Sequence, residues 1–146
     1  MNEDARSDVT VSDWNPTELE AFMAFEWPPH DTPLGIRWDA REVLLVAKAG
    51  DEALGAARGV LVGGVGELKQ LLVKKAQARA GVGSSLMTEF ERRCRTAGCH
   101  KLRLETADYQ ARPFYERHGF VCAATLENDR FGRALFVMEK MLRRAG

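Results

Sequence analysis

The sequence of 146 residues has few cysteines, no long apolar run and no excess of charge of either sign. Its three cysteines, Cys94, Cys99 and Cys122, are an odd number, which indicates reduced thiols rather than a disulfide framework. No apolar run approaches the length of about 18 residues that suggests a membrane helix, so we expect no membrane span. The 21 basic residues balance the 21 acidic ones, which argues against a nucleic-acid partner.

A zinc motif and a signal peptide are also missing. Cys94, Cys99 and His100 lie close together in the sequence, but their spacing differs from the common zinc pairs and a fourth ligand is missing. We therefore expect no metal. Residues 1–8 are acidic and polar and lack the basic and then apolar layout of a signal peptide, so we expect a cytoplasmic protein.

Length and composition are those of an ordinary globular protein, with 45% hydrophobic and 29% charged residues. A chain of this length buries a core without disulfides or metal, so we expect one domain over residues 1–146. Charge is unevenly spread. Residues 1–40 hold nine acidic side chains and two basic ones, whereas residues 74–118 hold ten basic and five acidic. The later stretch favours an anionic ligand and the earlier one a cationic ligand.

Hydrophobic periodicity predicts the helices and strands of the chain. Asn15 and Pro16 have the features of an N-cap and a first helical residue, and this helix is expected to run to about Trp27. Residues 27–40 contain three prolines and are expected to form a loop or a short irregular helix. Further helices are predicted over 81–98 and 109–118, and strands over 8–13, 43–49, 53–62, 67–73, 101–106, 120–126 and 134–141.

The predicted order of elements is β-α-β-β-β-α-β-α-β-β. It combines a meander of three strands with strand–helix–strand units. This order predicts an α/β (α+β) fold with a mixed, mostly antiparallel central sheet that is flanked by helices on both faces.

The passage from Val73 to Gly83 joins an apolar strand to an amphipathic helix through a glycine-containing turn. Gly81 and Gly83 let the backbone approach a ligand closely. The first N–H groups of the helix have no intrahelical partners and lie at the positive end of its dipole, which favours a phosphate or pyrophosphate. The turn lacks the lysine of a Walker loop and one glycine of the dinucleotide fingerprint. Polar side chains nearby add hydroxyl donors or positive charge: Ser84, Ser85, Lys74, Lys75 and Arg79.

Two segments resemble motifs of the GNAT superfamily of N-acetyltransferases. Residues 78–83, Ala-Arg-Ala-Gly-Val-Gly, resemble motif A, Gln/Arg-x-x-Gly-x-Gly/Ala, with Ala78 at the first position. Gln77 and Arg79 flank this alanine and are expected to substitute for the missing Gln or Arg. Residues 111–120 resemble the family's Ala-x-x-Phe/Leu-Tyr-x-x-x-Gly-Phe pattern, and Asp108 stands where members often carry Asn. Residues 137–142 resemble the family's last strand. The resemblance covers about residues 40–142. The first 40 residues resemble the family only in the order of their expected elements.

This resemblance implies acetyl-CoA as the co-substrate, an amine as the acceptor and the GNAT fold. It implies that backbone groups of Leu71, Leu72 and Val73 bind the pantetheine arm, with the Leu71 N–H facing the thioester carbonyl. Tyr115 resembles the general acid for the leaving thiolate; the alternative is a packed core tyrosine. The implied cofactor-binding set also includes Asp108, Tyr115 and the pyrophosphate residues Ala78, Arg79, Ala80, Gly81, Val82, Gly83 and Ser84.

The attacking amine must lose a proton, and Glu67 is the candidate base. The resemblance places a catalytic glutamate there, fourteen residues before Gly81. A glutamate carboxyl has an ordinary pKa of about 4.3, so it needs burial or a water chain to act as a base. The alternative is an exposed glutamate paired with Lys69. Glu105 and Asp108, at the end of the next strand, are the rival candidates for the base.

The acceptor is expected to be a primary amine on a small molecule or peptide. The first helix and the loop after it carry acidic and aromatic residues, which suggests a cationic acceptor. The alternative is a solvated acidic face around core aromatics. Two other functions stay open: a non-catalytic acyl-CoA sensor or interaction module on the same fold, and a different nucleotide-binding α/β protein, which the meander before the turn disfavours. The protein is expected to be a monomer or a homodimer.

Overall fold

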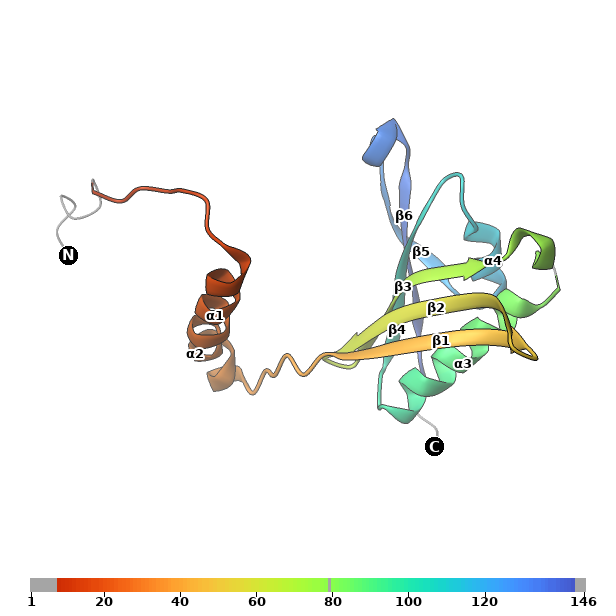
Figure 1. Cartoon of the computed structure of the whole chain (residues 1–146), viewed down its shortest axis with the longest axis horizontal. Coiled ribbons are helices and arrows are strands. Elements are labelled where there is room, and N and C mark those ends of the chain that lie inside the picture. The colour runs from red at the N-terminus through yellow and green to blue at the C-terminus, as the bar shows by residue number, and fades with distance from the viewer. Residues whose placement is uncertain (1–7, 79, 144–146) are drawn as a thin grey trace. The chain divides into compact units, whose positions relative to one another are not determined.

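The computed structural model describes residues 8–78 and 80–143. The chain divides into two compact units, Met1–Arg37 and Trp38–Gly146, and each is described by itself. Figure 1 shows the first unit as helical and the second as a sheet with helices. Within the described residues, no helix is long and apolar enough to cross a membrane.

The first unit is built on helix α1, Pro16–Glu26. Asn15 caps it as predicted, because its side chain accepts a hydrogen bond of 2.8 Å from the Glu18 N–H. The Trp14 ring meets the Phe22 ring edge-on, with centroids 5.6 Å apart. Residues 27–40 include a short helix α2, Pro28–Asp31, and a 3-10 turn η2, Thr32–Leu34, as expected for an irregular segment.

The strand predicted over residues 8–13 is wrong, because the structure shows no regular element there. Alternation of apolar and polar residues produces a strand only where a neighbouring strand completes its hydrogen bonds. None of the described residues of the first unit forms such a neighbour.

The second unit holds a six-stranded sheet in the order β1-β2-β3-β4-β6-β5 (Figure 1). The pair β3 and β4 is parallel and the other neighbours are antiparallel, so the sheet is mixed and mostly antiparallel as predicted. The strands are β1 Arg41–Ala49, β2 Glu52–Val62, β3 Val65–Val73, β4 Lys101–Ala107, β5 Val121–Leu126 and β6 Leu135–Met141. The remaining elements are η3 Lys75–Gln77, α3 Val82–Thr96, α4 Arg112–Arg117 and η4 Arg130–Gly132.

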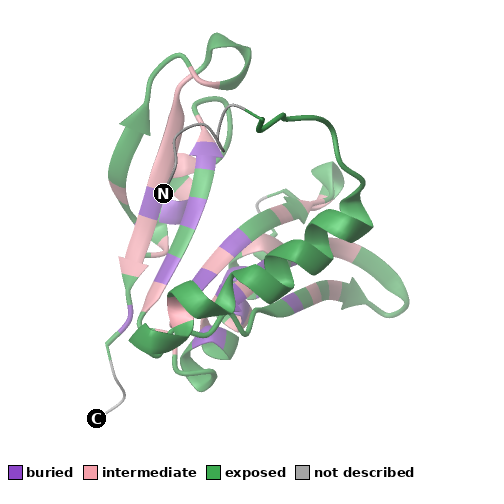
Figure 2. Cartoon of the chain, turned by 90° about the vertical axis from the view of Figure 1, so that its left-hand side faces the viewer, coloured by how far each residue is buried: buried purple, intermediate pink, exposed green. Residues whose placement is uncertain are grey.

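The core lies between α3 and one face of the sheet. Buried positions alternate with more exposed ones along β4 and along parts of β2 and β3 (Figure 2), as expected when one face of a sheet is covered. Gly59 of β2 lies directly beneath the Phe90 ring of α3, where a Cβ atom would collide with the ring. Phe90 is completely buried, and burial of a side chain of this size stabilises the fold by about 2–3 kcal/mol. The buried face of α3 consists of Leu86, Met87, Phe90 and Cys94.

A bulge in β3 lies at the point where β3 separates from β4. Arg58 of β2 pairs with Gln70 and Gly59 pairs with Leu68, so Lys69 is an extra residue on β3. The pairing of β3 with β4 ends at Leu68, although β4 remains paired with β6 as far as Ala107. The two parallel strands therefore diverge beyond the bulge and leave a gap between them.

Candidate functional site

Three cavities follow the gap between β3 and β4. We call them the turn cavity (540 Å³), the gap cavity (360 Å³) and the outer cavity (580 Å³). The turn and gap cavities share Leu71, Ala111 and Tyr115 in their walls. The gap and outer cavities share Leu68, Lys69, Glu105 and Gln110. Because neighbouring cavities have walls in common, the three lie in a row.

The turn cavity lies at the start of α3, where the sequence predicts an anion site. Gly81 precedes the helix with φ of 83°, a left-handed conformation that glycine adopts without strain. A Cβ atom on Gly83 would lie 3.4 Å from the Phe114 ring, so glycine also allows close packing here. The first N–H groups of α3 are free of intrahelical partners, which suits a phosphate group. The cavity is lined by Leu71, Val73, Gln77, Ala78, Gly81, Gly83, Ser84, Ala111, Phe114, Tyr115 and Arg117.

Most of the cofactor-binding residues predicted from the sequence lie together at these cavities. Leu72 lines the gap cavity, whereas Ala80 and Val82 belong to the turn without lining the turn cavity. Arg79 lies outside the described residues. Asp108 lines none of the three cavities. Its carboxylate accepts a hydrogen bond of 2.7 Å from the Arg133 guanidinium.

One residue of the turn cavity, Arg117, was not expected from the sequence, whereas Gln77 was expected to substitute for the Gln or Arg of the motif. Gln77 lies beside Ala78 and adds an amide side chain, and Arg117 adds a cation from the last turn of α4. The second motif contains Arg117, but its spacing does not show that α4 turns this side chain towards α3.

Tyr115 lies where the turn and gap cavities meet. The residue is 8% exposed, and its ring packs edge-on against Phe114 and Phe120. Burial raises the pKa of its phenol above the ordinary value of 10.0, so the hydroxyl stays protonated. Its oxygen has no hydrogen-bond partner among the described residues and is not a buried unsatisfied atom, so it is accessible from a cavity.

Glu67 forms ion pairs with two cations. Lys69 Nζ lies 2.6 Å from one of its carboxylate oxygens, and the Arg103 guanidinium donates to the other. Burial alone raises the pKa of this carboxyl, but hydrogen bonds and charge from Lys69 and Arg103 outweigh burial and leave the pKa below its ordinary value. The pairing with Lys69 weighed from the sequence is therefore present. A carboxylate held in this way is a weak base.

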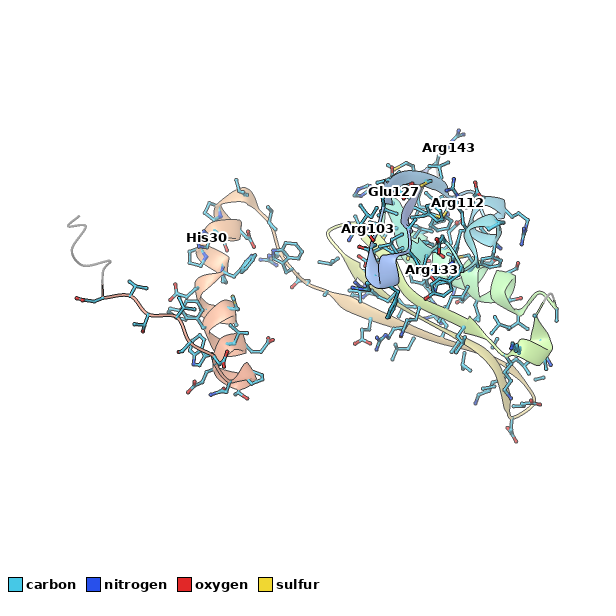
Figure 3. All side chains as sticks on the ribbon, turned by 90° about the horizontal axis from the view of Figure 1, so that it is seen from above. His30, Arg103, Arg112, Glu127, Arg133 and Arg143 are labelled. Atoms are coloured by element: carbon cyan, nitrogen blue, oxygen red, sulfur yellow. The ribbon has the colours of Figure 1, made fainter. Side chains whose placement is uncertain are left out.

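The two rival carboxylates differ from Glu67 and from each other. Asp108 is paired with Arg133, whose guanidinium also lies over the Tyr109 ring at 5.2 Å from its centroid. Glu105 has no ion pair or hydrogen bond with any other described residue, and it lines both the gap and outer cavities. Figure 3 shows Arg103 and Arg133 in the sheet unit, on β4 and just before β6.

The outer cavity is walled partly by the segment that joins β5 to β6. Asp129, Arg130 and Phe131 come from this segment, and Phe131 is 91% exposed with φ of 59°. Neither the Asp129 carboxylate nor the Arg130 guanidinium has a partner elsewhere in residues 8–78 and 80–143. With Glu105, the outer cavity therefore presents two free carboxylates and one free guanidinium.

The cysteines lie apart from these cavities. Cys94 is completely buried, and burial raises the pKa of its thiol to about 12. All three cysteines are free thiols. In the part of the chain that the structure describes, no three His, Cys, Asp or Glu residues gather as a metal site.

A family model and several similar proteins show to which family the chain belongs. Residues 10–120 match the model described as the acetyltransferase (GNAT) family. The chain is 34% identical over 76 residues to the "uncharacterized N-acetyltransferase YjcF" of Bacillus subtilis (strain 168). That match covers 52% of this chain and 54% of the relative, so it spans about half of the relative's length.

Solved structures of acetyltransferases have a similar fold. An acetyltransferase from Bacillus cereus ATCC 14579 has a TM-score of 0.81 and 22% identity, over 92% of this chain and 98% of that one. The ribosomal-protein-S18-alanine N-acetyltransferase from Escherichia coli has a TM-score of 0.66 and 21% identity, over 94% and 96%. At these identities, the likeness concerns the fold alone. The family match, which covers most of the chain, shows that this protein belongs to the acetyltransferase (GNAT) family.

Proposed function

We propose that the protein is an N-acetyltransferase that moves an acetyl group from acetyl-CoA to a primary amine by direct attack. The observation that carries this proposal is the Tyr115 hydroxyl, which is protonated, without a partner among the described residues, and located where the turn and gap cavities meet. A proton donor there is placed to serve the sulfur of a thioester that reaches from one cavity into the other.

The acetyl donor would occupy the turn cavity and the gap cavity. Its pyrophosphate would lie at the start of α3, where free N–H groups and the helix dipole favour negative charge. Its pantetheine arm would follow β3 beyond Leu68, because the pairing with β4 has ended there. Backbone groups of residues 71–73 on that side are thereby available to the arm, with the Leu71 N–H as a donor to the thioester carbonyl.

The reaction forms one bond and breaks another. The amine nitrogen attacks the thioester carbon, the C–N bond forms, and the C–S bond breaks. The leaving thiolate takes the Tyr115 proton, and the amine gives its proton to a base. We assign the base to Glu105 rather than Glu67, because Glu105 is free at the wall shared by the gap and outer cavities whereas two cations hold Glu67. Glu105 is exposed, so it would take the proton through a water chain rather than through a pKa raised by burial. Because the amine and the thioester would be held side by side at this point, their proximity would speed the reaction greatly.

The acceptor would enter through the outer cavity. Its lining holds as many acidic side chains (Glu67, Glu105 and Asp129) as basic ones (Lys69, Arg130 and Arg133), so its charge is balanced. The unpaired carboxylates of Glu105 and Asp129 are the groups that would pair with a cationic acceptor, and the acidic excess of residues 1–40 also favours a cation. We therefore expect higher kcat/KM for polyamines and lysyl peptides than for uncharged amines of similar size, and equal values would contradict the charge argument.

Two measurements test the proposal. Acetyl-CoA should raise the Tm of the protein in a thermal shift experiment, and ATP and NAD should leave it unchanged. With a panel of amines, the wild type should release thiol about a hundredfold faster than the Tyr115→Phe variant, because one general acid contributes about this much to a rate. Absence of acetyl-CoA binding at millimolar concentration would overturn the proposal.

A second candidate is a non-catalytic acyl-CoA sensor on the same fold. The observation that favours it is Ala78, which lines the turn cavity where the family motif has Gln or Arg. A sensor would bind acetyl-CoA without releasing thiol above the Tyr115→Phe background. The free hydroxyl of Tyr115 and the free carboxylate of Glu105 favour the enzyme.

A further inference from the structure

A serine and a histidine form a pair at the edge of the turn cavity. Ser84 Oγ lies 3.0 Å from His118 Nε2, and Ser84 also lines the turn cavity. Ser84 belongs to the first turn of α3, and His118 directly follows α4. The His118 ring also contacts the Phe114 ring, with centroids 4.7 Å apart. The pair therefore joins the start of one helix to the end of another beside the predicted pyrophosphate site.

The direction of this hydrogen bond decides what Ser84 offers to a ligand. If His118 Nε2 carries no proton, the Ser84 hydroxyl donates to it and turns only lone pairs towards the cavity. If Nε2 carries a proton, it donates to Ser84 Oγ, and the hydroxyl proton is free to point into the cavity. A pyrophosphate diester offers acceptors only and carries negative charge, so it is served by the second arrangement.

We propose that His118 positions the Ser84 hydroxyl as a donor to the pyrophosphate, so that binding of the acetyl donor is coupled to protonation of His118. This inference rests on the proposed function, because it requires acetyl-CoA in the turn cavity. The imidazolium carries protons on both ring nitrogens, so it always holds the pair in the productive arrangement. The neutral ring does so in one of its two tautomers.

The charges around His118 set the pH range of this coupling. Burial lowers the pKa of the free imidazole, Lys140 and Arg117 lower it further, and Glu91 opposes them. Lys140 of β6 donates to the His118 carbonyl and pairs with Glu91 of α3 at 2.6 Å. The free protein therefore holds mostly neutral imidazole at pH 7. A bound anion favours the imidazolium and raises this pKa, so affinity increases as pH falls through the bound-state pKa and levels off below the free-state pKa.

The test is the binding of dephospho-CoA measured by titration calorimetry between about pH 8 and pH 5. Dephospho-CoA keeps the pyrophosphate and lacks the terminal phosphate that would titrate in this range. For the wild type, we expect Kd to fall about three- to tenfold over this range, which corresponds to a shift of half to one pKa unit on binding. Titrations in buffers of different ionisation enthalpy should show net proton uptake near pH 6.

Two variants identify the groups. His118→Gln keeps an N–H donor for Ser84 but does not titrate, so Kd should be nearly constant with pH and proton uptake should vanish. Ser84→Ala removes the hydroxyl, so it should weaken binding and lose most of the pH dependence. Ser84 is exposed, and its substitution leaves the core intact even if thermal denaturation shows that His118→Gln is poorly folded.

Three outcomes would overturn the coupling alone, two of them in the variants. One is an equal pH dependence in the wild type and in folded His118→Gln, and the other is an unreduced pH dependence in Ser84→Ala. Binding by the wild type that does not vary with pH would also overturn it while leaving the proposed function in place. Absence of binding of either acetyl-CoA or dephospho-CoA at every pH would overturn the proposed function as well.

Discussion

At the scale of the residue, Tyr115 and Glu67 differ in what surrounds their acidic groups. The Tyr115 ring is buried among aromatic rings and its hydroxyl has no partner among the described residues, so the proton stays on the oxygen. Lys69 and Arg103 hold the Glu67 carboxylate in its charged form. The family motif predicts Tyr115 as the acid, and this role stays a proposal. The contact between Glu67 and Arg103 could not be predicted, because it joins residues 36 positions apart through the register of β3 and β4.

The pH dependence of kcat/KM tests the state of Tyr115. An acid must be protonated to act, and burial raises the pKa of Tyr115 above 10.0. We therefore expect kcat/KM to rise with pH as the amine loses its proton and to show no falling limb from Tyr115 below about pH 10. A falling limb near pH 8 that disappears in Tyr115→Phe would contradict this prediction.

Matched amide substitutions distinguish the two candidate bases. Glu105→Gln should lower kcat/KM for the amine at least about tenfold, because it removes the free carboxylate at the wall between the gap and outer cavities. Glu67→Gln keeps the shape of the side chain and should lower kcat/KM by a smaller factor. Steady-state kinetics with one amine and both variants checks the order, and a larger loss in Glu67→Gln would return the base to Glu67.

Glu67→Gln should also change how the free energy of unfolding depends on pH in the acid range. The folded-state pKa of Glu67 lies below its ordinary value, so its ion pairs stabilise the fold fully at pH values above that ordinary pKa. This contribution is lost as pH falls through the lowered folded-state pKa. Between about pH 6 and pH 3, the free energy of unfolding should therefore decrease more in the wild type than in Glu67→Gln. Urea denaturation at several pH values measures this difference, and parallel curves would contradict it.

At the scale of the element, the bulge in β3 opens the site. Strand and helix positions from β1 to β6 follow the hydrophobic pattern and were predicted to within a few residues. The bulge was not predicted, because one extra residue at Lys69 interrupts the alternation without changing the composition. The strand predicted over residues 8–13 failed for the opposite reason, since its pattern alternates but lacks a strand partner.

Deletion of Lys69 tests the role of the bulge. Without this residue, β3 could pair with β2 in regular register through Leu68 and Gln70, and its pairing with β4 would continue. We expect the variant to keep the sheet, as measured by circular dichroism, and to lose acetyl-CoA binding at least about tenfold because the gap narrows. Lys69→Ala keeps the bulge and is the control. Normal binding by a folded deletion variant would show that the bulge is dispensable.

At the scale of the whole molecule, the family match spans residues 10–120 and so includes parts of both compact units. The predicted fold class and the resemblance to the GNAT superfamily are confirmed. The single domain over residues 1–146 stays a prediction. The uneven charge also belongs to this scale, because the acidic excess lies in residues 1–40 and the basic excess in residues 74–118. Under the proposed function, the basic segment would suit the anionic donor and the acidic segment a cationic acceptor.

In the proposed reaction, acetyl transfer to an amine depends on the hydroxyl of Tyr115. The most direct measurement is mass spectrometry of the acetylated amine after incubation with acetyl-CoA, for the wild type and for Tyr115→Phe at equal saturation with the donor. We predict product from the wild type at a rate about a hundredfold above that of the variant, with similar acetyl-CoA affinity in both. Equal rates of product formation by the two proteins would contradict the role of Tyr115 as the acid, and no product from a wild type that binds acetyl-CoA would contradict the proposed transfer itself.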